Sequence, residues 1–360
     1  MTTSLPRTML RVLTVSFLLS TFAFAQHYTQ KNLVSDISGD ATITDPNLKN
    51  AWGLARSATS PWWVADNSSG LSTLYQAAGT IVPLVVTIPS PPDGTGPAAP
   101  TGIIFNGTTG FVLANGKSAA FIFDTEDGTI AAWNGGTTAV LEVDNSHNKA
   151  VYKGLTLSEI HGVHYLYATN FRAGRVEVYD TNFHRVRLSE EDFDDDRLPR
   201  GFAPFNIQAI GENIIVTYAK QDAEKHDDVA GAGLGFVNVY SRSGRLLSRL
   251  EHGWWLNSPW GIVMAPGEFG EFSHSLLIGN FGSGQIAAYN PVSGKFEGLV
   301  RNLDNSILSI DGLWALSFGN GAAAGPSTTL FFSAGPNGEA DGLFGTLTPL
   351  AAELTEEDEP

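Results

Sequence analysis

Gly128-Thr-Ile-Ala-Ala-Trp133 is one of six copies of a short phrase that decides the fold of this chain. Each copy begins with glycine and continues as an alternating apolar stretch, and five of the six have an aromatic residue at the sixth position. The copies are Gly70–Tyr75, Gly128–Trp133, Gly174–Tyr179, Gly235–Tyr240, Gly284–Tyr289 and Gly342–Leu347. An internal period of this kind indicates one supersecondary unit that is repeated and stacked on its neighbours.

A second phrase precedes each copy, and a strongly apolar segment lies between the two. The second phrase recurs every 49 to 55 residues, at Ala51–Leu54, Pro100–Ile103, Tyr152–Leu155, Pro204–Ile207, Pro259–Ile262 and Leu313–Leu316. Short alternating strands with glycine-rich turns, and no helical period, predict an antiparallel meander. The chain is therefore predicted to be all-β, a six-bladed β-propeller with four-stranded antiparallel blades. A solenoid is the structural alternative, but this repeat is long for one.

The last repeat is followed by little besides an acidic stretch, so blade six lacks its outer strand. The segment Asn32–Asp36 precedes blade one and has the composition of a strand. We expect it to pair with blade six and to close the ring without a covalent link. Such pairing offsets the entropy of holding the two ends of the chain together.

Residues 1–25 have the pattern of a signal peptide. Arg7 and Arg11 give a positive start, Val12–Phe24 is apolar, and Ala23–Ala25 is a small-residue cleavage site. An uncleaved anchor is the alternative, but the apolar stretch is short for a membrane span. We expect the mature protein to be exported, to the periplasm or outside the cell, without a stable membrane anchor.

The remaining chain divides into a propeller at residues 26–349 and an acidic, disordered tail at residues 350–360. The formal net charge is −16, and removal of two arginines with the signal peptide makes it −18. This charge disfavours nucleic acid as a partner. The chain has no cysteine, which excludes thiolate metal sites and cysteine nucleophiles. We expect a monomer.

Six stretches carry a resemblance to a known family: Asn32–Asp36, Thr44–Leu48, Trp52–Ala55, Ala203–Ile207, Tyr218–Asp222 and Lys225–Ala230. On these, the chain resembles the NHL-repeat and gluconolactonase-like six-bladed propellers. Within them it is similar to an uncharacterised family of exported bacterial proteins. The resemblance implies the propeller fold and no established activity, because one fold supports many chemistries.

In a meander, the start of each inner strand and the end of the next strand lie on the same face. This places a ring of side chains around one mouth of the central channel, where we expect a ligand to bind. The predicted ligand-binding residues at the strand starts are Trp52, Lys153, Phe205, Trp260 and Trp314. Tryptophan offers flat apolar surfaces for sugars, aromatic groups or cations, but these rings can equally be plugs packed between blades.

Oxygen-bearing side chains at the strand ends suggest a metal at the same mouth. Asp66, Asn170 and Asn280, with Asp228, are the predicted ligands of calcium or magnesium. The alternative is that these side chains only cap the turns that follow them.

Blade four breaks the pattern with a long charged loop, Lys220–Gly233, which we call the blade-four loop. A long polar insertion in a compact repeat is usually functional or disordered. Lys220 and Asp222 are predicted to bind ligand, and His226 and Asp227 are candidate catalytic residues or metal ligands. A solvated, salt-bridged lid is the alternative.

Three functions remain open. The favoured hypothesis is a binding module that uses the channel mouth and the blade-four loop to hold a small molecule, a carbohydrate or a protein. The second is a calcium- or magnesium-dependent hydrolase or lactonase of the gluconolactonase type. This chemistry needs a glutamate at the mouth, and the sequence predicts none there, which counts against the hydrolase hypothesis. The third is a structural scaffold for surface assembly. The sequence leaves open whether the protein is an enzyme.

Overall fold

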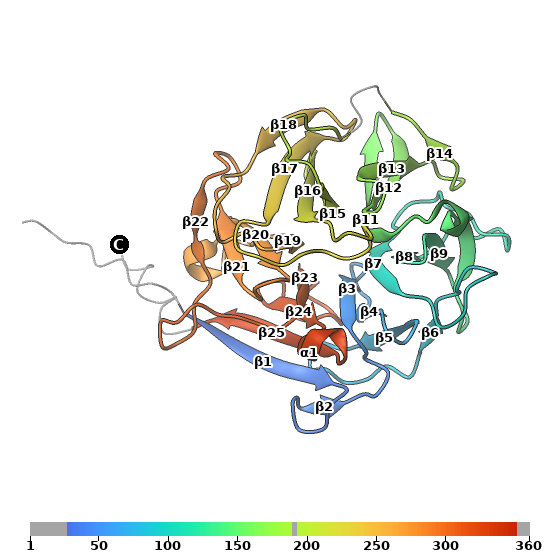
Figure 1. Ribbon diagram of the computed structural model, residues 1–360. Coiled ribbons are helices and arrows are strands. Elements are labelled where there is room, and N and C mark those ends of the chain that lie inside the picture. The colour runs from blue at the N-terminus through green and yellow to red at the C-terminus, as the bar shows by residue number, and fades with distance from the viewer. Residues whose placement is uncertain (1–26, 189–192, 351–360) are drawn as a thin grey trace, which may run out of the picture.

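The computed structural model describes residues 27–188 and 193–350, and in this part of the chain six sheets are arranged around one central axis (Figure 1). Their strands pair antiparallel, except for a short parallel pair at the outer edge of the sixth sheet. Five sheets have four strands and the sixth has five. The structure confirms the predicted six-bladed propeller. In each blade the strand that starts with the second phrase is innermost, and the glycine phrase forms the third strand.

The strands follow the repeats closely. Blade one has β3 (Ala51–Ala55), β4 (Trp62–Asp66), β5 (Leu71–Tyr75) and β6 (Val86–Thr87). Blade two has β7 (Pro100–Phe105), β8 (Phe121–Thr125), β9 (Thr129–Trp133) and β10 (Val140–Asp144), and a 3-10 turn at Ser146–Asn148 follows it. Blade three has β11 (Tyr152–Ile160), β12 (Val163–Asn170), β13 (Arg175–Tyr179) and β14 (Arg185–Val186). Blade four has β15 (Phe202–Ile210), β16 (Asn213–Lys220), β17 (Gly235–Ser241) and β18 (Leu246–Arg249).

Blade five has β19 (Pro259–Met264), β20 (Leu276–Asn280), β21 (Ile286–Tyr289) and β22 (Phe296–Leu299), with a 3-10 turn at Gly270–Phe272. Blade six has β23 (Leu313–Phe318), β24 (Leu330–Ala334) and β25 (Leu343–Pro349), and the short helical turn α1 (Pro336–Glu339) joins β24 to β25. Its outer strands are β1 (Tyr28–Ser35) and β2 (Ile43–Thr44) from the start of the described chain.

The ring is closed by pairing between the two ends of the chain. β1 pairs antiparallel with β25, from Tyr28 opposite Pro349 to Ser35 opposite Leu343, and Figure 1 shows the two strands side by side. This confirms that the segment around Asn32 supplies the missing outer strand of blade six. The strand begins earlier than expected, at Tyr28, whose hydroxyl donates to the Phe269 carbonyl of blade five over 2.8 Å.

The glycine of the repeated phrase is required for two different physical reasons. Gly70 lies in the turn between β4 and β5 with φ +70°, a left-handed conformation that side chains disfavour. At Gly342 the constraint is space, because an added Cβ would lie 2.0 Å from the Leu48 carbonyl oxygen. The glycine at this position of the repeat therefore allows a left-handed turn in blade one and close packing in blade six.

The predicted signal peptide and, except for Leu350, the predicted acidic tail lie outside the described residues. Their roles, and the expected export, stay predictions. No helix within residues 27–188 and 193–350 is long and apolar enough to cross a membrane.

Ring closure leads to a prediction about stability. Leu33 of β1 is 2% exposed and packs in a cluster with Val34, Leu48 and Phe344. We expect Leu33→Ala to lower the free energy of unfolding by about 2–5 kcal/mol, because it leaves a cavity in this cluster. Urea denaturation measures the effect. Lys31→Ala, on the exposed side of the same strand, should change stability by less than about 0.5 kcal/mol; equal effects of the two would contradict a packed closure.

Candidate functional site

An aromatic plug fills the central channel just below its mouth. It consists of Trp52, Phe171, Phe205, Trp260 and Trp314 with small alanines between them. Trp314 is stacked between Trp52 at 3.6 Å and Phe281 at 3.9 Å between ring centres. Both faces of that indole are therefore covered. Directly below the plug the channel is narrow, with a cavity of about 30 Å³, and it widens to about 300 Å³ at the far ends of the inner strands.

The predicted tryptophan platform is thus a packed core. Trp52 and Trp314 are each 1% exposed and Trp260 is 5% exposed. Trp260 Nε1 donates to the Lys153 carbonyl oxygen over 2.8 Å, and Phe205 is fully buried. The structure supports the plug alternative for these four aromatic residues, because a ligand cannot reach their ring faces without displacing their neighbours.

A buried lysine lies directly on the plug. Lys153 is 1% exposed, and its Nζ is 5.1 Å from the centre of the Trp52 ring and 5.8 Å from that of Phe171. The ammonium pairs with Glu126 Oε1 and, at 3.2 Å, with Asp227 Oδ1. Burial by itself opposes the charged form, but these two carboxylates hold the pKa of Lys153 above its ordinary value.

Polar side chains extend from Glu126 across the mouth to blade six. Asn67 Nδ2 donates to Glu126 Oε2 over 2.9 Å, and Asn50 Nδ2 donates to Asn67 Oδ1 over 3.2 Å. The same Asn50 amide donates to Glu339 Oε2 over 2.8 Å, while Trp314 Nε1 donates to Asn50 Oδ1 over 3.0 Å. The plug and the polar layer above it are therefore joined by hydrogen bonds.

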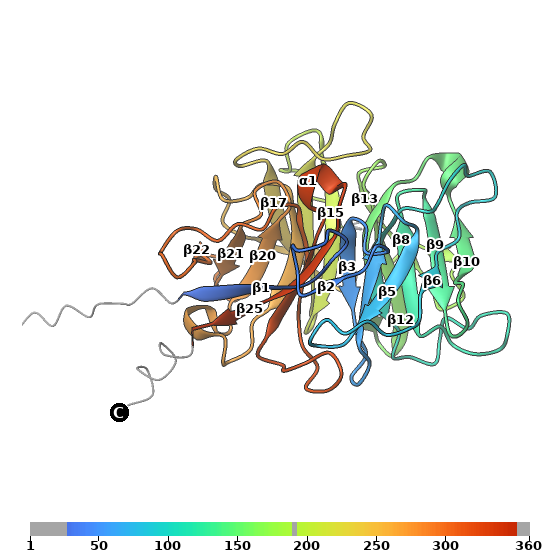
Figure 2. The ribbon, with the colours of Figure 1, turned by 90° about the horizontal axis from the view of Figure 1, so that it is seen from below.

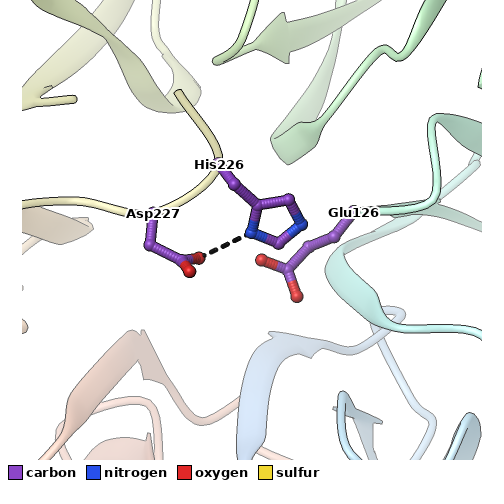
Figure 3. Close-up of side chains that lie close together, drawn as sticks. All are labelled: Glu126, His226 and Asp227. Carbon is purple, nitrogen blue, oxygen red and sulfur yellow. Dashed lines mark hydrogen bonds and ion pairs between the residues drawn. The ribbon is translucent and has the colours of Figure 1, made fainter. Parts of the chain in front are cut away.

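The blade-four loop completes the arrangement. It rises from the same face as α1, as Figure 2 shows, and Gln221 Nε2 anchors it to the Phe171 carbonyl over 2.6 Å. His226 Nδ1 lies 2.9 Å from Asp227 Oδ1, with Glu126 across from the ring (Figure 3). The hydrogen bond raises the pKa of His226 and lowers that of Asp227 below its ordinary range. We call Glu126, Lys153, His226, Asp227 and Glu339 the mouth cluster.

Two predicted residues of the loop lie apart from this cluster. Lys220 Nζ donates to the Arg200 carbonyl over 3.2 Å and lies 5.4 Å from the centre of the Phe202 ring. Asp222 Oδ1 accepts the His226 backbone N–H over 2.8 Å. Lys220 therefore packs on its own blade, and Asp222 shapes the loop that presents His226 and Asp227.

The structure does not bring the predicted metal ligands together. Asp66 Oδ2 accepts the Thr73 N–H over 2.9 Å, Asn170 Oδ1 accepts that of Ala173 over 3.1 Å, and Asn280 Oδ1 accepts that of Asn257 over 2.8 Å. Each side chain thus binds backbone. Asn170 caps the turn that follows it, as the capping alternative predicts, whereas Asp66 binds the next strand, β5, and Asn280 binds the segment before β19.

The two acidic members of the predicted metal set are unsuited to an ion for a further reason. Burial raises the pKa of Asp66 well above its usual range, and it also raises the pKa of Asp228. Burial therefore disfavours the charged form of both carboxyls, which is the form that calcium and magnesium prefer.

Glutamates are present at the mouth, contrary to the sequence-based expectation. Glu126 lies in the turn between β8 and β9, and Glu339 lies at the end of α1 with φ +68°. Ligand atoms of Glu126, His226 and Asp227 all lie within 4.8 Å of one another, a spacing compatible with a metal ion. The Lys153 ammonium, however, already pairs with both carboxylates. As arranged, these residues do not fit a divalent ion, because the lysine supplies the cation.

No protein-family profile matches the chain. An uncharacterised protein of Acanthamoeba polyphaga mimivirus is 30% identical over 330 residues, which covers 88% of this chain and 78% of the relative. A second uncharacterised mimivirus protein is 29% identical over 330 residues, with 88% and 84% covered. This chain belongs to the family of these mimivirus proteins. The bacterial, exported family expected from the sequence stays a prediction.

Solved structures resemble this family member in fold alone. A streptogramin B lyase has a TM-score of 0.50 at 12% identity, over 90% of this chain and 98% of the lyase chain. A protein of unknown function from Bacteroides thetaiotaomicron has a TM-score of 0.55 at 10% identity, over 91% and 76%. The expected similarity to six-bladed propellers is supported at this level, and the gluconolactonase-type activity stays a prediction.

Glu339 leads to a prediction about pH. Burial raises its pKa from 4.5 to about 7, although the hydrogen bond from Asn50 opposes the shift. Between these values the unfolded chain has lost the proton while the folded protein keeps it, so the free energy of unfolding falls as pH rises. Glu339→Gln has no carboxyl group to titrate, so its stability should not fall in this way. We expect the free energy of unfolding of this variant, minus that of the native protein, to increase by up to about 3 kcal/mol as the pH rises over that range.

Urea denaturation at a series of pH values tests the effect of Glu339. The control is Glu268→Gln, which replaces an exposed glutamate of blade five. A constant difference between Glu339→Gln and the native protein from pH 4 to 8 would contradict the buried environment of Glu339.

Lys153 leads to a prediction about metal binding. Replacement by methionine removes the cation from between Glu126 and Asp227, so these carboxylates and His226 become free to bind a divalent ion. We expect Mn²⁺ and Ca²⁺ to raise the melting temperature of Lys153→Met, reversibly with EDTA, and by clearly less in the native protein. Lys220→Met is the matched control. An equal shift in the native protein would show that Lys153 does not exclude the ion.

Proposed function

We propose that this protein is a binding module that holds a small polar ligand over the mouth cluster. The observation that carries the proposal is the buried ammonium of Lys153 in blade three, which pairs with Glu126 of blade two and Asp227 of the blade-four loop. Glu339 of blade six joins this arrangement through hydrogen bonds of Asn50 and Asn67. The blade-four loop is a long charged insertion in the repeat, and it contacts the channel mouth as well as solvent.

The chemistry of the exposed groups indicates the kind of ligand. The side chain of Asp227 is 64% exposed and that of His226 is 43% exposed, while Lys153 is buried beneath them. The cluster has three carboxyl groups against one lysine and one histidine, so hydrogen-bond acceptors predominate. A ligand that donates hydrogen bonds, either an amine or a polyol, complements this surface.

The buried groups make the surface preorganised. Lys153 and Asn67 hold Glu126, while Lys153 and His226 hold Asp227. A ligand that meets side chains already fixed in place loses less conformational freedom of the protein on binding. The metal-dependent hydrolase is the less supported function, because Lys153 neutralises the carboxylates that an ion would need.

The test is titration calorimetry with two groups of probes, an amine arm with putrescine and spermidine and a sugar arm with glucose, cellobiose and glucono-lactone. We expect one arm to bind saturably. Asp227→Asn should weaken that binding at least about tenfold, or about 1.4 kcal/mol, because it removes a charged acceptor. Asp93→Asn, at an exposed site on another loop, is the control.

The two arms distinguish a cationic ligand from a neutral polyol. If the amine arm binds, affinity should fall with salt, because exposed charges are screened; sugar binding should be nearly independent of salt. Absence of binding in both arms, or binding that Asp227→Asn leaves unchanged, would contradict the proposal and favour a structural scaffold.

A further inference from the structure

A second candidate site lies at the rim of the propeller, between blades two and three. It is a cavity of about 320 Å³. Its lining comes from the connection between β10 and β11, the turn between β12 and β13, and the strands β13 and β14. Five charged side chains line it: Lys149, Arg172, Arg175, Glu177 and Arg185. We call this cavity the interblade cleft.

The charge of the interblade cleft is opposite to that of the protein. Lys149, Arg172, Arg175 and Arg185 line it, against one acid, Glu177, so the formal charge of the lining is +3, four positive less one negative. The chain as a whole carries −16. A local concentration of positive charge on an acidic protein attracts anions and holds them at short range.

Glu177 organises two of the four cations. It is 2% exposed, and its Oε1 accepts Arg175 Nε over 3.0 Å and an Arg175 terminal nitrogen over 2.7 Å. Arg185 lies 3.4 Å from the same oxygen. Oε2 accepts the hydroxyls of Tyr152 over 2.7 Å and Tyr179 over 3.0 Å. Both oxygens are thus fully engaged, and the guanidinium of Arg175 is fixed in orientation.

This network keeps Glu177 charged. Burial alone would raise its pKa, but the hydrogen bonds from Tyr152 and Arg175 hold the pKa below the ordinary value. A single carboxylate neutralises one of two arginines. The side chains of Arg175 and Arg185 are 52% and 49% exposed, so donors of both remain open to the cleft.

The other two cations are not explained by Glu177. Arg172 Nε is buried and has no hydrogen-bond partner among the described residues. A buried guanidinium N–H without a partner costs free energy unless something accepts it. Lys149, with φ +55°, is held in the left-handed region directly after the 3-10 turn and lines the same cavity. The unpartnered Arg172 Nε points to an acceptor that the described residues do not supply.

We propose that the interblade cleft binds a small oxyanion group, a phosphate or a sulfate, through Lys149, Arg172, Arg175 and Arg185. A planar guanidinium presents paired N–H donors that match the oxygens of such a group, and three guanidiniums with one ammonium provide donors on several sides. The volume is sufficient for the anion together with a small attached group. This site is separate from the mouth cluster and has the opposite charge.

The experiment is titration calorimetry with inorganic phosphate and with sulfate, at constant ionic strength against chloride. We expect saturable binding of at least one anion. The principal variant is Lys149→Gln with Arg172→Gln, because neither side chain contacts Glu177 and the fold should be unaffected. It should weaken anion binding at least about tenfold, through loss of charge-assisted hydrogen bonds. Arg245→Gln, an exposed arginine on blade four, is the control.

A second variant, Arg175→Gln, removes a donor that also serves Glu177. Its urea denaturation is measured beside its anion affinity, so that loss of stability is separated from loss of binding. We expect weaker binding to a protein that is still folded. Addition of phosphate should also raise the unfolding midpoint of the native protein more than that of the double variant.

The source of the anion is resolved by comparing inorganic phosphate, glucose 6-phosphate and glucose. Tighter binding of the ester than of inorganic phosphate, with no binding of glucose at this site, indicates an organic phosphate ligand; the reverse order indicates the free ion. Asp227→Asn should leave the affinities for inorganic phosphate and sulfate unchanged, so this proposal and that for the mouth cluster fail independently. No saturable binding of either anion, or equal binding by the double variant, would overturn it.

Discussion

The close approach of the six inner strands around the axis is the constraint on which the rest of this structure depends. At Gly53 an added Cβ would lie 2.5 Å from the Thr101 carbonyl oxygen of the next blade, and at Gly154 it would lie 2.1 Å from Asn206 Oδ1. At these two glycines the neighbouring blades approach too closely for even a methyl group. Hydrogen bonds then cross from blade to blade, as from Asn206 Nδ2 to the Trp260 carbonyl over 2.7 Å.

This packing also determines where a ligand can bind. With the inner strands so close, the large aromatic residues at their starts fill the top of the channel, and the polar groups are displaced to the layer above. Lys153 lies where these two layers meet, with its stem on the plug and its ammonium among carboxylates. The blade-four loop then adds the two groups nearest to solvent, His226 and Asp227. Between neighbouring blades, the wider rim leaves space for the interblade cleft.

Much of the fold and the position of the mouth could be predicted from the sequence. The glycine phrases marked the third strands, the missing strand after Gly342–Leu347 indicated closure by the segment at Asn32, and the charged insertion pointed to His226 and Asp227. The direction of a side chain could not be predicted in this way. Asp66 and Asn280 bind backbone in their own blades, and Glu126 and Glu339 reach the mouth from turns that have no distinctive motif.

What the sequence alone determined is periodic: the number of blades, their strands, and the borrowed strand that closes the ring. These follow from local alternation and turn chemistry, which depend on residues close together in the chain. Only the tertiary structure decided which groups meet. Asn50 and Glu339 are hydrogen-bonded although 289 residues apart, and the four cations of the interblade cleft come from three separate segments. The first contact arises when the ring closes and brings blade six against blade one. The second arises when blade three folds against the segment that links it to blade two, and neither juxtaposition is marked by a local sequence pattern.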